Sequence, residues 1–228
     1  MKYHILGSFF IMLLIGCKPK NEENANASES IKAQTILEKV ANAHGFDHWK
    51  KVKSIKFTFN VNRDSSHFER TWIWKPEQNH ITAVSQDGDT LRYSRNQMDS
   101  VAFKANAGFI NDRYWLLAPF NLIWDANNFT YEHVAGQQAP ISKSLMQKLT
   151  IVYGSEGGYT PGDAYDFYFE DDFLIQEWVF RKSNQSEPST ITTWEDYNDY
   201  SGLKLASMHH KDDDSFTLSL SGIEVVSE

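Results

Sequence analysis

The chain has 228 residues, with 22 Lys and Arg against 30 Asp and Glu, and its formal net charge at pH 7 is -8. An acidic balance argues against binding to nucleic acid, whose phosphates require a basic face, and against electrostatic docking on anionic lipid headgroups. The chain has 1 cysteine, which leaves no pair for an intrachain disulfide. The fold must therefore be held by burial of apolar side chains, and aromatic residues, at 14% of the chain, supply the material.

The N-terminal segment has the pattern of a secretion signal that ends at a cysteine. A positive residue precedes the apolar run Ile5–Ile15, which is too short to span a bilayer. The closing residues Leu14-Ile15-Gly16-Cys17 resemble the lipobox of bacterial lipoproteins. The resemblance implies cleavage after Gly16, diacylglycerol on the Cys17 thiol and acylation of the new N-terminus. The alternative is an ordinary signal peptide that happens to contain a cysteine.

Three segments follow from this pattern: a signal peptide over 1–16, a tether over 17–30 and a folded domain over 31–228. The tether includes Asn21–Ser30, which is polar, lacks large apolar residues and cannot bury enough surface to order itself. No second apolar run approaches the roughly 18 residues of a membrane helix. We therefore expect a protein that is anchored to a membrane by lipid and does not span it.

The folded domain should begin with one helix and continue as strands. Ile31–His44 shows apolar residues on one helical face, and Gly45 stands where a helix ends. After Val52 the apolar period becomes two, which is typical of strands. The predicted strands are Ile55–Val61, Phe68–Trp74, Ile81–Ala83, Thr90–Tyr93, Ala164–Glu170, Phe173–Arg181, Ser189–Tyr197, Leu203–His210 and Phe216–Val225. Short strands, tight turns and few helices predict a mainly β (α+β) fold built on an antiparallel sheet.

One segment, Ala105–Trp124, is apolar and aromatic and alternates poorly. We expect a short helix around Gly108–Leu117, ended by Pro119, and then a loop, because proline cannot continue a helix.

Motifs for catalysis or metal binding are absent from the sequence. There is no nucleophile elbow, Walker motif or dinucleotide fingerprint. His209 and His210 precede an acidic run, but adjacent residues of a strand face opposite sides. We therefore predict no catalytic residue, no metal and no cofactor. An enzyme would require His44, His48 or His209 to meet a carboxylate in a cleft.

The motifs of the last third resemble those of the outer-membrane lipoprotein-sorting (LolA/LolB-like) superfamily. They are Asp166-x-Tyr168-x-x-x-Asp172-x-Leu174, Trp178-x-Phe180, and Thr193-Trp194-Glu195-Asp196-Tyr197 leading to Gly202-Leu203-Lys204. Two further stretches, Asn111–Phe120 and Ala43-His44-Gly45, resemble a branch of secreted lipoproteins of unknown function. The resemblance implies a single curved antiparallel sheet, a half-barrel, closed by a few short helices over an apolar cavity that holds acyl chains in the carriers of this group. On that basis Ala105–Trp124 is the lid.

The aromatic residues then have two interpretations, as packed core or as the lining of a ligand cavity. The candidate ligand-binding residues are Trp72, Trp74, Trp115, Leu116, Phe120, Trp124 and Trp178. We expect a non-enzymatic lipoprotein of a Gram-negative cell envelope, anchored in the outer membrane through Cys17, that binds a lipid, an acyl chain or a lipidated protein. The alternative is an envelope scaffold protein with a solid core and no ligand cavity.

Overall fold

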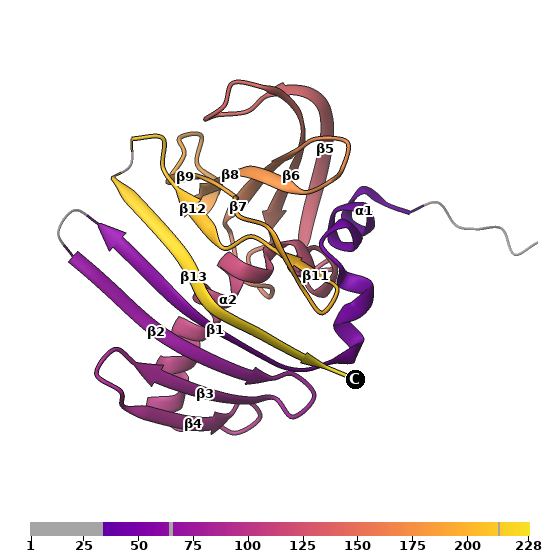
Figure 1. Cartoon of the computed structure of the whole chain (residues 1–228). Coiled ribbons are helices and arrows are strands. Elements are labelled where there is room, and N and C mark those ends of the chain that lie inside the picture. Colours follow the sequence, from indigo (N-terminus) through magenta and orange to yellow (C-terminus); the bar gives the residue numbers. More distant parts are fainter. Residues whose placement is uncertain (1–33, 64–65, 214) are drawn as a thin grey trace, which may run out of the picture. The chain divides into compact units, whose positions relative to one another are not determined.

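The computed structural model describes residues 34–63, 66–213 and 215–228. The predicted signal peptide, the tether and Cys17 lie outside the described residues. Two antiparallel sheets and one long helix make up most of the described chain (Figure 1). No helix among the described residues is both long enough and apolar enough to cross a bilayer.

The first sheet has six antiparallel strands in the order β12-β13-β1-β2-β3-β4. The strands are β1 (Val52–Arg63), β2 (Ser66–Lys75), β3 (His80–Ser85), β4 (Thr90–Ser94), β12 (Met208–His210) and β13 (Phe216–Ser227). Ile55 and Phe57 of β1 pair with Trp74 and Trp72 of β2, and all four side chains are buried. Alternation along the strands therefore places these large residues on one inner face.

The second sheet has five antiparallel strands in the order β5-β6-β7-β8-β9. They are β5 (Phe129–Gln138), β6 (Leu145–Tyr153), β7 (Ala164–Phe169), β8 (Ile175–Arg181) and β9 (Thr190–Thr193), with a separate hairpin of β10 (Asn198–Tyr200) and β11 (Leu203–Leu205) and the short η2 turn (Lys182–Asn184). A single antiparallel bridge between Glu195 and Met208 joins the edges of the two sheets, where Glu195 N–H donates to the Met208 carbonyl at 2.9 Å. The predicted mainly β (α+β) fold, with antiparallel strands that do not close into a barrel and few helices, is confirmed, and the strands that were expected in a single curved sheet divide into two main sheets. The sequence patterns predicted neither β5 nor β6.

Helix α2 (Ser100–Trp124) is longer than the predicted Gly108–Leu117. Asp99 caps its start by accepting a hydrogen bond from Ala102 N–H at 2.8 Å. Pro119 does not end it. The helix kinks at Leu117, whose φ of -124° is not helical, and Pro119 falls in the first turn after the kink, where its missing N–H removes no helical hydrogen bond.

Helix α2 lies between the two sheets and packs against both (Figure 1). Phe109, Leu117 and Phe120 belong to the cluster on the first sheet. Tyr114 and Ala118 belong to the cluster on the second sheet. The stretch Leu116–Leu122 of α2 is buried on every side, and a helical stretch enclosed in this way shows no clear apolar period. The segment predicted as a lid is thus the central helix of the core.

The first helix, α1 (Ile36–Ala43), is shorter than the predicted Ile31–His44 because Thr35 caps it in a capping box with Glu38. Leu37 and Val40 bury its apolar face. Gly45 follows with a φ of 88°, and a Cβ there would lie 2.0 Å from the Gly202 carbonyl oxygen. This position therefore requires glycine, and the short helix η1 (Phe46–Lys51) continues from it.

Candidate functional site

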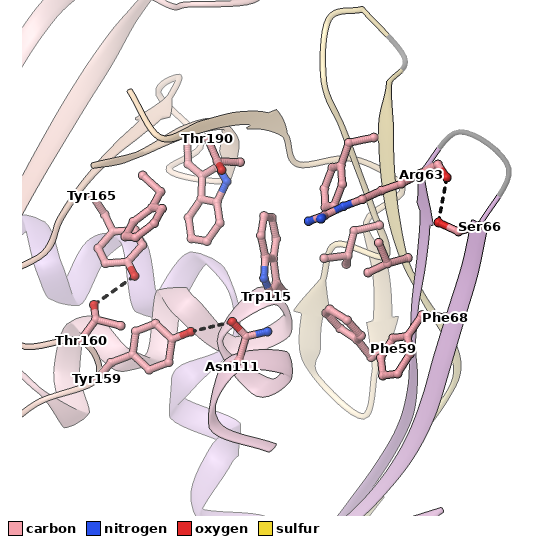
Figure 2. Close-up of a pocket in the computed structure, with 15 residues that line it drawn as sticks. Phe59, Arg63, Ser66, Phe68, Asn111, Trp115, Tyr159, Thr160, Tyr165 and Thr190 are labelled. Carbon is pink, nitrogen blue, oxygen red and sulfur yellow. Dashed lines mark hydrogen bonds between the residues drawn. The ribbon is translucent and has the colours of Figure 1, made fainter. Parts of the chain in front are cut away.

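A cavity of about 550 Å³ opens between the two sheets beside α2 (Figure 2). We call it the interior cavity. Its lining is Phe59, Val61, Arg63, Ser66, Phe68, Asn111, Trp115, Tyr159, Thr160, Tyr165, Trp178, Phe180, Thr190, Phe216 and Leu218. The volume falls within the roughly 300–1,000 Å³ of small-molecule pockets.

One wall of the interior cavity is aromatic and is formed by α2 and the second sheet. Trp115 of α2 meets Trp178 of β8 edge to face, with ring centroids 4.6 Å apart. Tyr165 of β7 lies 5.4 Å from Trp178 and 5.1 Å from Phe180. Rings at these distances fix one another, so the wall is already formed without a ligand.

The opposite wall comes from the first sheet. Phe59 and Val61 lie on β1, and Phe216 and Leu218 lie on the adjacent β13. Alternation points these residues to the inner face of the sheet, where Phe59, Phe216 and Leu218 are buried. Both walls are thus apolar.

Polar groups stand between and around these apolar walls. Tyr165 and Thr160 hydroxyls share a hydrogen bond of 3.0 Å, and Tyr159 O–H donates to Asn111 Oδ1 at 3.5 Å (Figure 2). The Arg63 guanidinium lies 5.1 Å from the centre of the Phe216 ring. Among the described residues, those that line the interior cavity include no histidine, cysteine or carboxylate. The cavity therefore presents apolar surface with hydroxyl groups and one cation, which suits binding of an apolar group.

The predicted ligand-binding residues fall into separate places. Trp115 and Trp178 line the interior cavity. Trp72, Trp74, Leu116 and Phe120 are buried in the cluster between α2 and the first sheet. Trp72 also borders a recess of about 570 Å³ beside the β3–β4 turn. Trp124 packs against Trp49 at 5.0 Å and lines a smaller pocket.

Several residues of the interior cavity were not among the sequence candidates. Phe59 and Val61, and likewise Phe216 and Leu218, show strand alternation, which gives the face but cannot distinguish a cavity wall from packed core. Tyr159 lies in a glycine-rich loop with no periodic signal. Only the packing of distant elements brings these side chains together.

The buried histidines have structural surroundings. His44 Nδ1–H donates to the Val40 carbonyl at 2.8 Å, and Ile175 N–H donates to His44 Nε2 at 3.4 Å. The His209 ring packs against Trp194 at 4.6 Å and Trp115 at 5.4 Å. Neither forms an ion pair with a carboxylate of the described residues. Within the same residues, no three His, Cys, Asp or Glu side chains are close enough to hold a metal ion.

The chain is similar in fold to several solved structures. They include a LolA superfamily protein from Nitrosomonas europaea (12% identity, TM-score 0.49, 86% of this chain and 94% of that chain) and a DUF1329 family protein from Desulfovibrio piger (8%, 0.46, 83% and 91%). A third is an outer membrane lipoprotein-sorting protein domain from Vibrio parahaemolyticus (8%, 0.44, 83% and 93%). No protein-family model and no curated protein matches the chain.

Two of these neighbours bear the name of the group that the sequence motifs resemble. At identities of 12% or less the likeness concerns the fold alone. The ligand and the partners therefore have to be inferred from the residues of this chain.

Proposed function

We propose that this protein is a membrane-anchored lipoprotein of the cell envelope that binds an apolar ligand, a lipid or an acyl chain, in the interior cavity. The observation that carries the proposal is a cavity of about 550 Å³ with apolar walls from both sheets and α2. Removing apolar ligand surface from water is favourable by about 25 cal/mol per Å². A preformed wall lowers the cost of ordering side chains on binding.

The predicted anchor supports this function. Lipid on Cys17 would hold the domain near a membrane, where lipids and lipidated proteins are concentrated. A lipid-anchored binder stays on its membrane, so it would receive or sequester its ligand there and would not ferry it. The competing function, a scaffold with a solid core, draws support from the close packing of Trp72 and Trp74 on Phe109 at 5.5 Å each.

Filling the interior cavity should abolish ligand uptake. Thr190 lies on β9 and lines the cavity, so Thr190→Trp would place a large ring inside it. We expect the affinity for a fluorescent fatty acid to fall at least about tenfold. Titration of residues 18–228 with the probe, and native mass spectrometry of the complex, would measure this.

The matched control is Thr130→Trp, the same change at an exposed position of β5. It should bind the probe like the unsubstituted protein. Equal binding by Thr190→Trp would place the ligand elsewhere. A protein that is always empty and takes up no probe would favour the scaffold function.

The anchor is tested at Cys17. Cys17→Ser should release the protein from the membrane into the soluble fraction, because stable anchoring takes more than one acyl chain and processing would supply several on this residue. Fractionation and the mass of the N-terminal peptide would detect the change. Retention of the variant on the membrane would contradict the lipoprotein assignment.

A further inference from the structure

A second pocket, of about 240 Å³, carries two arginines and lies apart from the apolar walls described above. We call it the arginine pocket. Arg95, Arg113, Asn121, Trp124, Asp125 and Tyr159 contribute to its lining. It is smaller than the roughly 300–1,000 Å³ of drug-sized pockets, and it admits a small polar group more readily than an acyl chain.

Arg113 forms no ion pair within 4.0 Å among the described residues. Its guanidinium lies over the rings of Trp124 at 5.1 Å, Trp74 at 5.4 Å and Phe109 at 6.0 Å. Its buried Nε has no hydrogen-bond partner among the described residues. A buried charge is costly unless it is paired and hydrogen-bonded, and aromatic faces satisfy it only in part.

Arg95 places a second positive charge beside the first. Its guanidinium lies 5.6 Å from the centre of the Phe109 ring that Arg113 also contacts. Arg95 Nε donates to Asn106 at 3.1 Å, and none of the ion pairs of the described residues involves either arginine. Burial, and to a lesser degree the charge of Arg95, lowers the pKa of Arg113 to about 10, so both arginines are charged at pH 7.

The carboxylate in the pocket does not neutralise these charges fully. Asp125 accepts hydrogen bonds from Asn121 Nδ2 at 2.8 Å and from Tyr153 O–H at 3.1 Å. Two arginines and one aspartate leave the lining with one net positive charge. An anion that fits the pocket would therefore be attracted to it.

The side chain of Asn121 indicates which kind of anion fits the arginine pocket. It is 2% exposed, and its Oδ1 is a buried acceptor without a partner in the described chain. Such an acceptor requires a donor, since leaving it unpaired costs free energy. A ligand that offers both oxyanion oxygens to the arginines and an O–H to Asn121 would satisfy all three side chains. A phosphate group that keeps one proton has this chemistry, whereas sulfate and carboxylate at neutral pH have no O–H.

We propose that the arginine pocket binds a phosphate group through Arg95, Arg113 and Asn121. Tyr159 lines both this pocket and the interior cavity, so the phosphate could be a free ion or the monoester headgroup of a lipid. Recognition of the phosphate rests on the arginine pocket itself and does not depend on what the interior cavity binds.

The test is calorimetric titration of the full-length lipidated chain in phosphatidylcholine nanodiscs at pH 6.5. Inorganic phosphate should bind at least about tenfold more tightly than sulfate, the difference expected from one satisfied buried acceptor. Equal affinities for the two ions would overturn the proposal. So would the absence of phosphate binding at concentrations up to about 10 mM, because a Kd above this concentration is weaker than that of most specific complexes. This comparison uses the unsubstituted protein and so cannot be confused by misfolding.

Variants locate the site and the ligand source. Arg95→Gln and Arg113→Gln should each weaken phosphate binding about tenfold or more. The control is Arg92→Gln, at an exposed position of β4, the strand that ends one residue before Arg95; this variant should not change phosphate binding. Unchanged binding in both pocket variants would overturn the assignment. Dihexanoyl phosphatidic acid binding more tightly than inorganic phosphate identifies a lipid headgroup, and the reverse order identifies the free ion; either supports the site.

Discussion

Asp112→Ala is expected to lower the free energy of unfolding by about 3–4 kcal/mol, or roughly 6–16 °C in Tm. Asp112 of α2 is fully buried and accepts hydrogen bonds from Arg70 Nη2 at 2.7 Å and Trp72 Nε1 at 2.8 Å, in addition to an ion pair with Arg70 Nε. Removing one member of a buried pair leaves the others unpaired. The estimate lies toward the lower end for such pairs because the Arg70 side chain is 29% exposed and keeps some contact with water.

Urea unfolding followed by tryptophan fluorescence would measure the loss. Asp112→Asn keeps the shape and removes the charge, so the difference between the unsubstituted protein and Asp112→Asn reports the ionic contribution. The control is Glu224→Gln in the exposed Lys56–Glu224 pair, which should change the unfolding free energy by less than about 1 kcal/mol. A similarly small effect of Asp112→Ala would show that Asp112 does not fasten α2 to the first sheet.

Stability should fall steeply as the pH drops from about 6.5 to about 4. Burial is the main reason that the pKa of His44 is lowered to about 4 and that of His209 to about 3. Between these values and the unfolded value of 6.5, the unfolded chain binds more protons than the folded chain. The folded state therefore loses stability as the pH falls, by about 3 kcal/mol for each histidine at pH 4.

Burial gives this sign for His44, because the ring is 1% exposed and a charged imidazolium there would lose its contact with water. Unfolding free energies measured at several pH values would test the prediction. A double variant, His44→Gln with His209→Gln, should show a flatter pH dependence over this range, whatever its stability at pH 7. His133→Gln, at an exposed position of β5, should keep the original slope; an unchanged slope in the double variant would contradict the prediction.

The strands show which elements of the fold sequence patterns can predict and which they cannot. Alternation predicted β1, β2, β7 and β13, because a strand with one face on the core repeats every two residues. It did not reveal β5, whose residues are mostly exposed and follow no apolar alternation. The sequence also predicts an end of the helix at Pro119, but the kink at Leu117 accommodates this proline and α2 continues to Trp124.

The candidate site was predicted only in part. Trp115 and Trp178 line the interior cavity, while Trp72 and Trp74, chosen for the same chemistry, are packed against Phe109. Periodicity assigns a side chain to a face of an element, but whether that face meets a neighbour or a cavity depends on the spacing between elements. Phe59 and Phe216 belong to strands far apart in the sequence and share a wall because β1 pairs with β13.

The sequence by itself determined the antiparallel β class, the acidic charge and the end of the first helix before Gly45, because composition, period and helix-ending residues are local properties of the chain. The lipid anchor on Cys17 stays a prediction from the same local evidence. Only the tertiary structure decided which aromatic side chains border a cavity and that Asp112 pairs with Arg70 across 42 residues. It also decided that Arg95 and Arg113 share a pocket with Asp125, while none of the ion pairs of the described residues involves either arginine. These features depend on which elements, distant in the sequence, come into contact. Burial at those contacts determines the free-energy cost of each charge.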